Sequence, residues 1–271
     1  LSMKISVIVP TYQPANYLWE CLDSLCRQTL APEEFETVIV LNGCNEPYFG
    51  RIQQYIHAHP LHNFQLIQTE VGGVSNARNI GIDQSKGEYL SFLDDDDWVT
   101  DNYLEELLQR ATPEAIVHAN VIQYRDSTGE KMDYFLTSVF QRLQGSQKLT
   151  FFNARSFLSS SCCKLIPRKV IGTERFNKAY KLGEDSLFMF TISRRIRSIR
   201  MSGEDAIYYV RNRDNSASHK TYPYSYRLQV AFGLTFSYLA LFLRRPFAYN
   251  FPFFLTRVAA TLRKLFTRKY E

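Results

Sequence analysis

Four consecutive aspartates are the residues of this sequence best suited to chemistry. They follow the apolar run 89–93, whose aromatic and branched side chains are typical of a buried strand. In an extended backbone successive side chains alternate, so Asp94 and Asp96 would face one side. Asp95 and Asp97 would face the other. Four like charges repel one another, and their hard oxygens suit Mg²⁺ or Mn²⁺, with substrate phosphates completing the shell. The run therefore indicates a metal site.

An ordinary acidic turn explains the same run without any ligand. In that case Asp97 or Thr100 would cap a helix that begins near Asn102. Carboxylates at strand ends are common, so the aspartates alone leave both explanations open.

A second acidic pair, Glu184 and Asp185, follows Gly183 and precedes an apolar run. This pattern predicts a helix that begins at the pair, where acidic side chains stabilise the helix dipole. Taken alone, the pair is explained by helix capping.

The glycine-rich stretch 72–81 predicts a helix start close to a ligand. Gly72 and Gly73 precede Ser75, which we expect to be the N-cap. The free N–H groups and the positive dipole end at such a start favour anions. Arg78 lies one turn further on, where its guanidinium could meet a phosphate. A plain loop-to-helix junction is the alternative.

The elements that must position these residues alternate between strands and helices. The predicted strands are 3–9, 35–41, 64–68 and 89–93, and the predicted helices are 17–28, 49–59 and one from Ser75. This alternation is typical of a doubly wound α/β sheet, in which ligands bind beyond the carboxyl ends of the strands. The loops at Thr11, Asn42 and Asp94 follow strands, so we expect them to meet at one edge of the sheet.

The second half is predicted to add strands and then helices. We expect strands at 115–123, 159–166 and 206–211, a packed rather than transmembrane helix at 226–243, and a basic amphipathic helix at 257–269. The last helix would carry Val258, Leu262, Leu265 and Phe266 on one side. Such a helix can lie on an anionic membrane surface, pack on the core with a solvated face, or form a homodimer contact.

Composition excludes several classes of protein. With 271 residues, 45% of them hydrophobic, the chain is typical of a globular protein with one large core. The net charge of +5 is too small to indicate a nucleic-acid partner. The five cysteines form no CxxC pair, so we expect reduced thiols. Since 4–10 already has the pattern of a strand, we expect no secretory leader. A cytoplasmic protein is predicted, with the inner face of the cell membrane as a possible site of attachment.

Four segments together resemble glycosyltransferase family 2: the run Val7–Tyr12, the stretch Gly72–Asn79, the strand and acidic run Gly87–Trp98, and Leu182–Asp185. The resemblance implies a GT-A fold, a Rossmann-like doubly wound mixed sheet followed by C-terminal helices. It implies a metal-dependent, inverting transfer of a sugar from a nucleoside diphosphate, with Mn²⁺ or Mg²⁺ as cofactor.

The resemblance also implies a domain organisation. Residues 3–220 would form the catalytic domain, with 3–118 binding the nucleotide-sugar and 119–220 on the acceptor side. Within that second half, the irregular region 126–160 would face the acceptor. Residues 221–271 would form a helical, basic amphipathic extension.

The family's chemistry assigns roles to the two acidic segments. Asp185 would be the general base that takes a proton from an acceptor hydroxyl, with Glu184 positioning the acceptor or its loop. Asp96 would bind the metal. Asp94 and Asp95 would hold hydroxyls of the ribose and of the donor sugar.

Further donor contacts are expected from the loops. By resemblance, the remaining substrate-binding residues are Pro10, Thr11, Tyr12, Asn42, Arg78 and Arg211, with Arg213 as an alternative to Arg211 at the diphosphate and His219 near the metal. Family members carry Asp-Asp-Gly or Asp-Asp-Asn after the second strand, where this chain has Leu41-Asn42-Gly43. Asn42 can hydrogen-bond a base edge but supplies no charge. By resemblance a UDP-sugar is the favoured donor, although the asparagine at this position supports uridine recognition less directly than an aspartate would.

The expected acceptor is a saccharide or a lipid-linked saccharide in cell-surface polysaccharide synthesis, which rests on analogy with the family. A sugar-phosphate nucleotidyltransferase is one alternative, but it would need a basic, glycine-rich first loop that Pro10–Gln13 lacks. A non-catalytic nucleotide-sugar-binding protein is the other, and the retained acidic residues argue against it.

Overall fold

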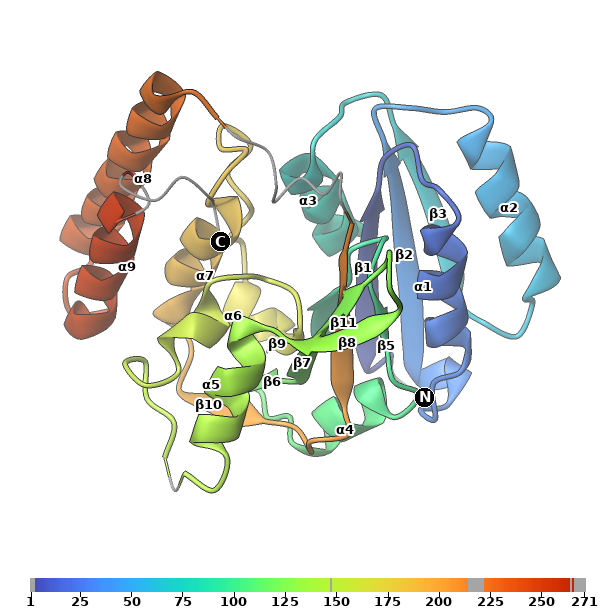
Figure 1. The fold of residues 1–271 in the computed structure, drawn as a ribbon, viewed down its shortest axis with the longest axis horizontal. Helices are drawn as coiled ribbons and strands as arrows, with labels where there is room; N and C mark the ends of the chain where they lie inside the picture. The colour runs from blue at the N-terminus through green and yellow to red at the C-terminus, as the bar shows by residue number, and fades with distance from the viewer. Residues whose placement is uncertain (1–2, 147, 214–221, 264, 266–271) are drawn as a thin grey trace.

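A seven-stranded mixed sheet, with helices packed on both faces, organises the molecule (Figure 1). The computed structural model describes residues 3–146, 148–213, 222–263 and 265. In spatial order the strands are β10 (Ser198–Met201), β6 (Ala115–His118), β9 (Lys164–Pro167), β4 (Tyr89–Phe92), β1 (Ile5–Thr11), β2 (Phe35–Asn42) and β3 (Phe64–Thr69). Neighbouring strands are parallel except at β9, which runs antiparallel to both β4 and β6. The predicted α/β class and mixed sheet are confirmed.

The helices form where the apolar residues recur at helical spacing. Their bounds are α1 (Tyr17–Cys26), α2 (Tyr48–Ala58), α3 (Val74–Gln84), α4 (Tyr103–Gln109), α5 (Phe135–Leu143), α6 (Arg168–Ile171), α7 (Glu184–Ser193), α8 (Tyr224–Arg244) and α9 (Phe251–Arg263), with 3₁₀ turns η1 (Pro32–Glu34) and η2 (Arg155–Leu158). In α1, for example, the buried residues Leu18, Leu22 and Leu25 fall on one stripe that faces the core.

The site is set by the position of β1 in the sheet. β1 pairs in parallel with β2 on one side and with β4 on the other, so the order of strands reverses at β1. Such a reversal opens a crevice beyond the carboxyl ends of the strands, because the flanking loops diverge to opposite sides. Thr11, Asn42 and the acidic run after β4 lie at this edge, as the sequence predicted.

A second sheet of four strands closes over this edge. Its order is β5 (Trp98–Val99), β11 (Ile207–Asn212), β7 (Asn120–Arg125) and β8 (Glu130–Asp133). The single strand predicted at 115–123 is wrong: it is β6 in the first sheet and β7 in the second. The chain changes sheets at Ala119. The Ala119 N–H donates a hydrogen bond to the Cys163 carbonyl, just before β9, whereas the Asn120 N–H donates to the Ala206 carbonyl, just before β11. β9 and β10, from the second half of the chain, join the same sheet as β1–β4. The predicted division between residues 3–118 and 119–220 therefore stays a prediction about which half binds which substrate.

The α8–α9 pair lies at the side of the molecule opposite α2 (Figure 1). It packs on α7, where the Tyr238 hydroxyl is 2.9 Å from Ser186 Oγ. Of the helices in the described part of the chain, α8 is long and apolar enough to cross a membrane by length and composition alone.

The last helix differs from its prediction. It begins at Phe251 rather than 257, and the predicted residues 264 and 266–269 lie outside the described part. Its buried side carries Arg257 and Thr261, whereas Leu262 is exposed. Phe253 and Phe254 are buried on the same side, and Arg257 makes the polar contacts described below, so this side faces the core in place of Leu262.

Candidate active site

The acidic run forms a turn rather than an extended strand. The Asp97 N–H donates to the Asp94 carbonyl at 3.1 Å, because the chain must turn here from β4 in one sheet to β5 in the other. The predicted alternation of the four side chains is therefore wrong. The described structure also gives no helix-capping role to Asp97 or Thr100, since Asn102 occupies the N-cap of α4.

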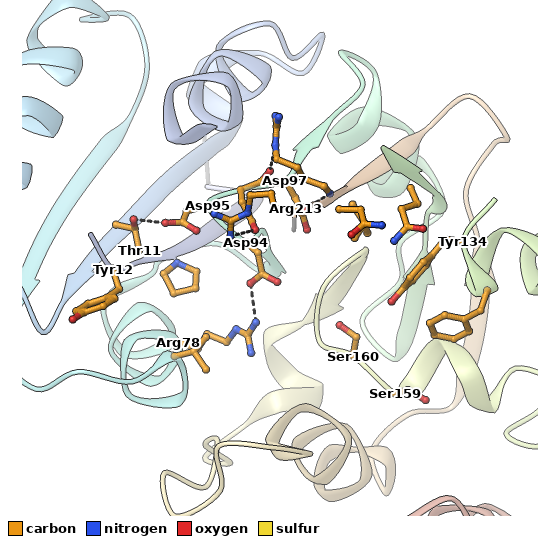
Figure 2. Close-up of a pocket in the computed structure, with 18 of the residues that line it drawn as sticks. Thr11, Tyr12, Arg78, Asp94, Asp95, Asp97, Tyr134, Ser159, Ser160 and Arg213 are labelled. Carbon is orange, nitrogen blue, oxygen red and sulfur yellow. Dashed lines mark hydrogen bonds and ion pairs between the residues drawn. The ribbon is translucent and has the colours of Figure 1, made fainter. Parts of the chain in front are cut away.

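Each aspartate has a different partner (Figure 2). Asp94 Oδ1 accepts from Arg78 Nη2 at 2.8 Å, Asp95 accepts from the Thr11 hydroxyl, Asp96 pairs with the Arg213 guanidinium, and Asp97 accepts from the Arg211 backbone N–H at 2.8 Å. Asp97 is also buried and lies next to the Tyr208 hydroxyl. It therefore holds the turn in shape, and the other three carboxylates remain candidates for ligand contacts.

The turn has more negative charge than its cationic partners neutralise. Burial raises the pKa of Asp95 to about 7, and the negative charges of Asp96 and Asp94 add to this increase. The hydrogen bond from Thr11 opposes it. Burial and the charge of Asp94 also raise the pKa of Asp96, although Arg213 opposes this. A cation bound here would relieve both costs, because it favours the ionised carboxylates.

The donor chemistry of the turn fits Mg²⁺ or Mn²⁺, which prefer carboxylate oxygen. No group of three His, Cys, Asp or Glu in the described residues is arranged to hold a metal ion. A cation at Asp96 would therefore need oxygen ligands from a substrate as well.

A cavity of about 2370 Å³ opens at this edge of the sheet. It brings together most of the residues predicted from sequence, namely Pro10, Thr11, Tyr12, Asn42, Arg78, Asp94, Asp95, Asp96 and Arg211. Glu184 and Asp185 do not line it themselves.

Arg78 connects the two acidic segments. Its guanidinium, only 3% exposed, donates from Nη2 to Asp94 and from Nη1 to Asp185 Oδ1 at 2.9 Å. Both carboxylates raise the pKa of Arg78 against the effect of burial, so the charge is held firmly. Asp185 thus lies one hydrogen bond behind the cavity wall, and Arg78 connects it to Asp94.

One oxygen of Asp185 remains available. Ser161 Oγ donates to the same Oδ1 that Arg78 uses, at 2.6 Å, and no donor to Oδ2 is found in the described part of the chain. The side chain is 22% exposed. Beside it, burial and then the charge of Asp185 raise the pKa of Glu184 to about 7. The buried Ser161 was not predicted, because only the fold carries it to α7.

Asn42 holds two loops together. Its Nδ2 donates to the Thr11 carbonyl at 2.7 Å, and its Oδ1 accepts from the Gly73 N–H at 2.8 Å. It also lines the cavity. Contact with a base edge stays a prediction, and the structure gives Asn42 this second role of fixing the start of α3.

The start of α3 differs from prediction in its cap. Gly73, at φ 121°, takes the N-cap position, and Ser75 lies inside the first turn with its hydroxyl buried and unbonded. A residue with a Cβ is strained at this φ, which explains the glycine. Gly72, Gly73 and Val74 all line the cavity.

Two arginines from the end of β11 reach the acidic turn, and they differ in availability. Arg211 pairs with Glu20 and Asp126 and lies over the Trp98 ring at 4.6 Å. Arg213 pairs with Asp96. Both arginines line the cavity. Because two carboxylates already bind the guanidinium group of Arg211, Arg213 is better placed to bind a ligand anion. The predicted His219 lies outside the described residues.

Sequence reasoning expected region 126–160 to face an acceptor, but it singled out none of the residues that form the far wall of the cavity. That wall carries Arg155, Ser156, Ser159 and Ser160 around η2, with Arg257 and Arg263 from α9. No local pattern marks these residues, because they come from segments that only the tertiary fold brings together.

The sheet order, the acidic turn after β4 and the cavity at the strand ends define the GT-A fold class. Residues 6–173 match the model of the family described as glycosyl transferase family 2, which covers more than half of the chain. The chain belongs to this family.

Several curated relatives are similar over part of their length. Glycosyltransferase GlyA of Streptococcus pneumoniae is 32% identical over 67% of this chain and 27% of its own length. Poly(ribitol-phosphate) beta-N-acetylglucosaminyltransferase TarS of Staphylococcus aureus is 27% identical over 81% of this chain and 38% of its own. The chain thus spans well under half the length of these relatives.

Solved structures agree on the fold. The structure of S. aureus TarS residues 1–349 in complex with UDP has a TM-score of 0.73 at 22% identity, covering 97% of this chain and 72% of that one. The complex of the same fragment with UDP-GlcNAc has a TM-score of 0.70 at 24% identity, covering 88% and 67%.

Proposed function

We propose that this protein is an inverting glycosyltransferase. It would move a sugar from a nucleoside diphosphate, with UDP favoured, to a saccharide or lipid-linked acceptor in cell-surface polysaccharide synthesis. The observation that carries the proposal is Arg78, which joins the acidic turn at Asp94 to Asp185 beside one cavity. The names of the relatives and the nucleotides bound in the TarS structures support the substrate class.

In this proposal the donor occupies the end of the cavity formed by β1, β2 and α3. Asp94 and Asp95 would accept hydrogen bonds from hydroxyls of the ribose and the donor sugar. Arg213, which lines the cavity beside Asp96, would neutralise the diphosphate. Mg²⁺ or Mn²⁺ held by Asp96 would stabilise the negative charge that grows on the leaving diphosphate.

Asp185 would act as the general base through its free Oδ2. An acceptor hydroxyl is a weak nucleophile at neutral pH, and a carboxylate that takes its proton accelerates attack by about 10²–10⁴-fold. The new bond forms to the anomeric carbon as its bond to the phosphate oxygen breaks. Because attack comes from the face opposite the diphosphate, the configuration inverts. Arg78 and Ser161 orient Asp185 by binding Oδ1.

The two alternatives fit less well. A nucleotidyltransferase would need cationic residues in the first loop, where Pro10–Gln13 has none. A non-catalytic binding protein would have no need for a buried arginine that orients a carboxylate with a free oxygen.

Donor binding is tested by a thermal-shift panel of UDP, UDP-sugars, GDP and ADP, each with and without Mn²⁺. A UDP-sugar at 100 times its Kd should stabilise the fold by about 2.7 kcal/mol, since it binds only the folded state. We expect the largest rise in Tm for a UDP-sugar with Mn²⁺. Equal shifts for all nucleotides, or none, would contradict the assignment of the donor.

We further propose peripheral contact with an anionic membrane. The basic helix predicted at 257–269 was the candidate for this contact in the sequence, and an exposed apolar stripe now favours α8. Phe232, Phe236, Leu239 and Leu243 form one exposed stripe on this helix, and Phe232 and Phe236 are 64% and 71% exposed. Between 215 and 270 the sequence has nine Lys or Arg and no Asp or Glu. Arg257 and Arg263 line the cavity, and the other seven cations complement an anionic surface.

This contact is tested by sedimentation with vesicles. We expect the chain to bind vesicles containing phosphatidylglycerol but not pure phosphatidylcholine. Phe232→Ser combined with Phe236→Ser should abolish binding, whereas Leu61→Ser, at an exposed position elsewhere, should not. Equal sedimentation of the double variant and the wild type would rule the stripe out.

A further inference from the structure

Arg257 is a buried cation without a counter-ion in the described part of the chain. Its side chain on α9 is 5% exposed. Nη1 donates to Ser159 Oγ at 3.1 Å and Nη2 to the Arg155 carbonyl at 3.2 Å, which are both neutral acceptors, and its buried Nε has no partner. Among the described residues no carboxylate pairs with it. Burying a charge without a partner is costly, so an arginine held this way indicates that an anion is missing.

Two further guanidinium groups lie on the same wall. Arg155 and Arg263 line the cavity together with Arg257, and neither forms an ion pair within the described part of the chain. Burial and the positive charge of Arg155 lower the pKa of Arg257. An anion between these groups would remove the repulsion and satisfy the unbonded nitrogen.

The wall also supplies neutral donors suited to an oxyanion. Ser156, Ser159 and Ser160 line the cavity beside the arginines. Hydroxyls and guanidinium groups together match the several oxygens of a phosphate, and a guanidinium can bind two of them at once. The composition of the wall therefore favours phosphate over a single carboxylate.

This wall lies across the cavity from the proposed nucleoside end. In Figure 2 the acidic turn stands between Thr11 and Tyr12 on one side and Ser159 and Ser160 on the other. Since Arg257 bonds Ser159, the basic wall belongs to the second side. A molecule bound there approaches the acidic turn from the direction opposite the donor nucleoside.

We propose that Arg155, Arg257 and Arg263 form a binding site for a phosphate group carried by the acceptor. The phosphate belongs to a phosphodiester chain or to a lipid diphosphate, which share the chemistry this wall recognises. The assignment to the acceptor rests on the proposed function, whereas the phosphate site itself does not.

The first experiment titrates inorganic phosphate into the full chain while UDP saturates the donor end, and follows heat and Tm. The wild type should bind phosphate. Arg257→Gln and Arg263→Gln should each weaken it by about tenfold or more, because each removes charge-assisted hydrogen bonds. Arg197→Gln, at an exposed arginine outside the cavity lining, should leave the affinity unchanged.

The controls separate this site from the donor site. UDP affinity should be the same in the wild type and in all three variants. If the wild type does not bind UDP, the proposed function fails, and phosphate titrated alone still tests the arginines. If Arg257→Gln does not fold, the exposed Arg263 decides the result.

A second arm identifies the source of the phosphate. A glycerol-phosphate trimer and octyl diphosphate replace inorganic phosphate in the same titration. Tighter binding of the trimer supports a phosphodiester acceptor, and tighter binding of octyl diphosphate supports a lipid-linked one. Failure of the wild type to bind phosphate, or unchanged affinity in both folded variants, overturns the site.

Discussion

Asp185→Asn is expected to lower the rate of sugar transfer by about 10²–10⁴-fold while leaving donor affinity unchanged. The amide has the shape of the carboxylate and can still accept from Arg78 and Ser161 through its oxygen. It cannot take a proton from an acceptor hydroxyl. The measurement is kcat for transfer beside the Kd for the donor, because loss of a base affects the first and not the second.

Ser161→Ala is the matched comparison for that experiment. It removes one hydrogen bond to Oδ1 but keeps the carboxylate, so we expect a loss of about tenfold, as for one hydrogen bond to a charged group. Glu184→Gln tests the neighbouring carboxyl group. Unimpaired transfer by Asp185→Asn, with a large loss in Glu184→Gln, would move the base to Glu184.

Asp96→Ala is expected to abolish the part of donor binding and turnover that depends on Mn²⁺ or Mg²⁺, with the fold intact. The side chain belongs to a crowded acidic turn in which burial and then the charge of Asp94 raise its pKa, so its removal relieves both costs. The partner it leaves behind, Arg213, is 31% exposed and can be solvated. The readouts are the Mn²⁺-dependent rise in Tm with donor, the turnover, and the Tm of the free protein.

Asp126→Ala is the control for this variant. Asp126 is also a carboxylate paired with an arginine, Arg211, but it does not line the cavity. We expect it to keep the response to Mn²⁺. A metal response equal in Asp96→Ala and wild type would remove Asp96 from the proposed metal site.

The local sequence pattern was sufficient to predict those strands and helices that form from the periodicity of a single segment. The β-branched run that became β1 and the helical spacing of Leu18, Leu22 and Leu25 each fix an element through their own periodicity. The parallel order of such units then places Thr11, Asn42 and Asp94 at one edge, which is why most of the predicted residues line one cavity.

Features decided by contacts distant in the sequence were not predictable. The acidic run looked extended because its own residues do not show that β4 and β5 belong to different sheets. Ala119 is another such case, since both of its flanking segments are good strands and only their partners differ. On α9, the apolar spacing after residue 257 favoured burial of Leu262, whereas the buried side carries Phe253 and Phe254 together with Arg257, which bonds η2.

The site was predicted less completely than the fold for the same reason. Arg78 was expected to support a donor, but its second bond reaches Asp185, 107 positions away. Asn42 was expected to face a base, and its bonds to Thr11 and Gly73 depend on two loops that the sequence shows only separately.

The two hydrogen bonds that Arg78 donates to carboxylates have a consequence for ligand binding at the proposed site. A single guanidinium bonds Asp94, on the proposed donor side, and Asp185, on the proposed acceptor side. A ligand that engages Asp94 changes how tightly Arg78 holds Asp185, so the two occupancies are energetically linked. Such linkage is reciprocal: the factor by which donor improves acceptor affinity equals the factor by which acceptor improves that of the donor.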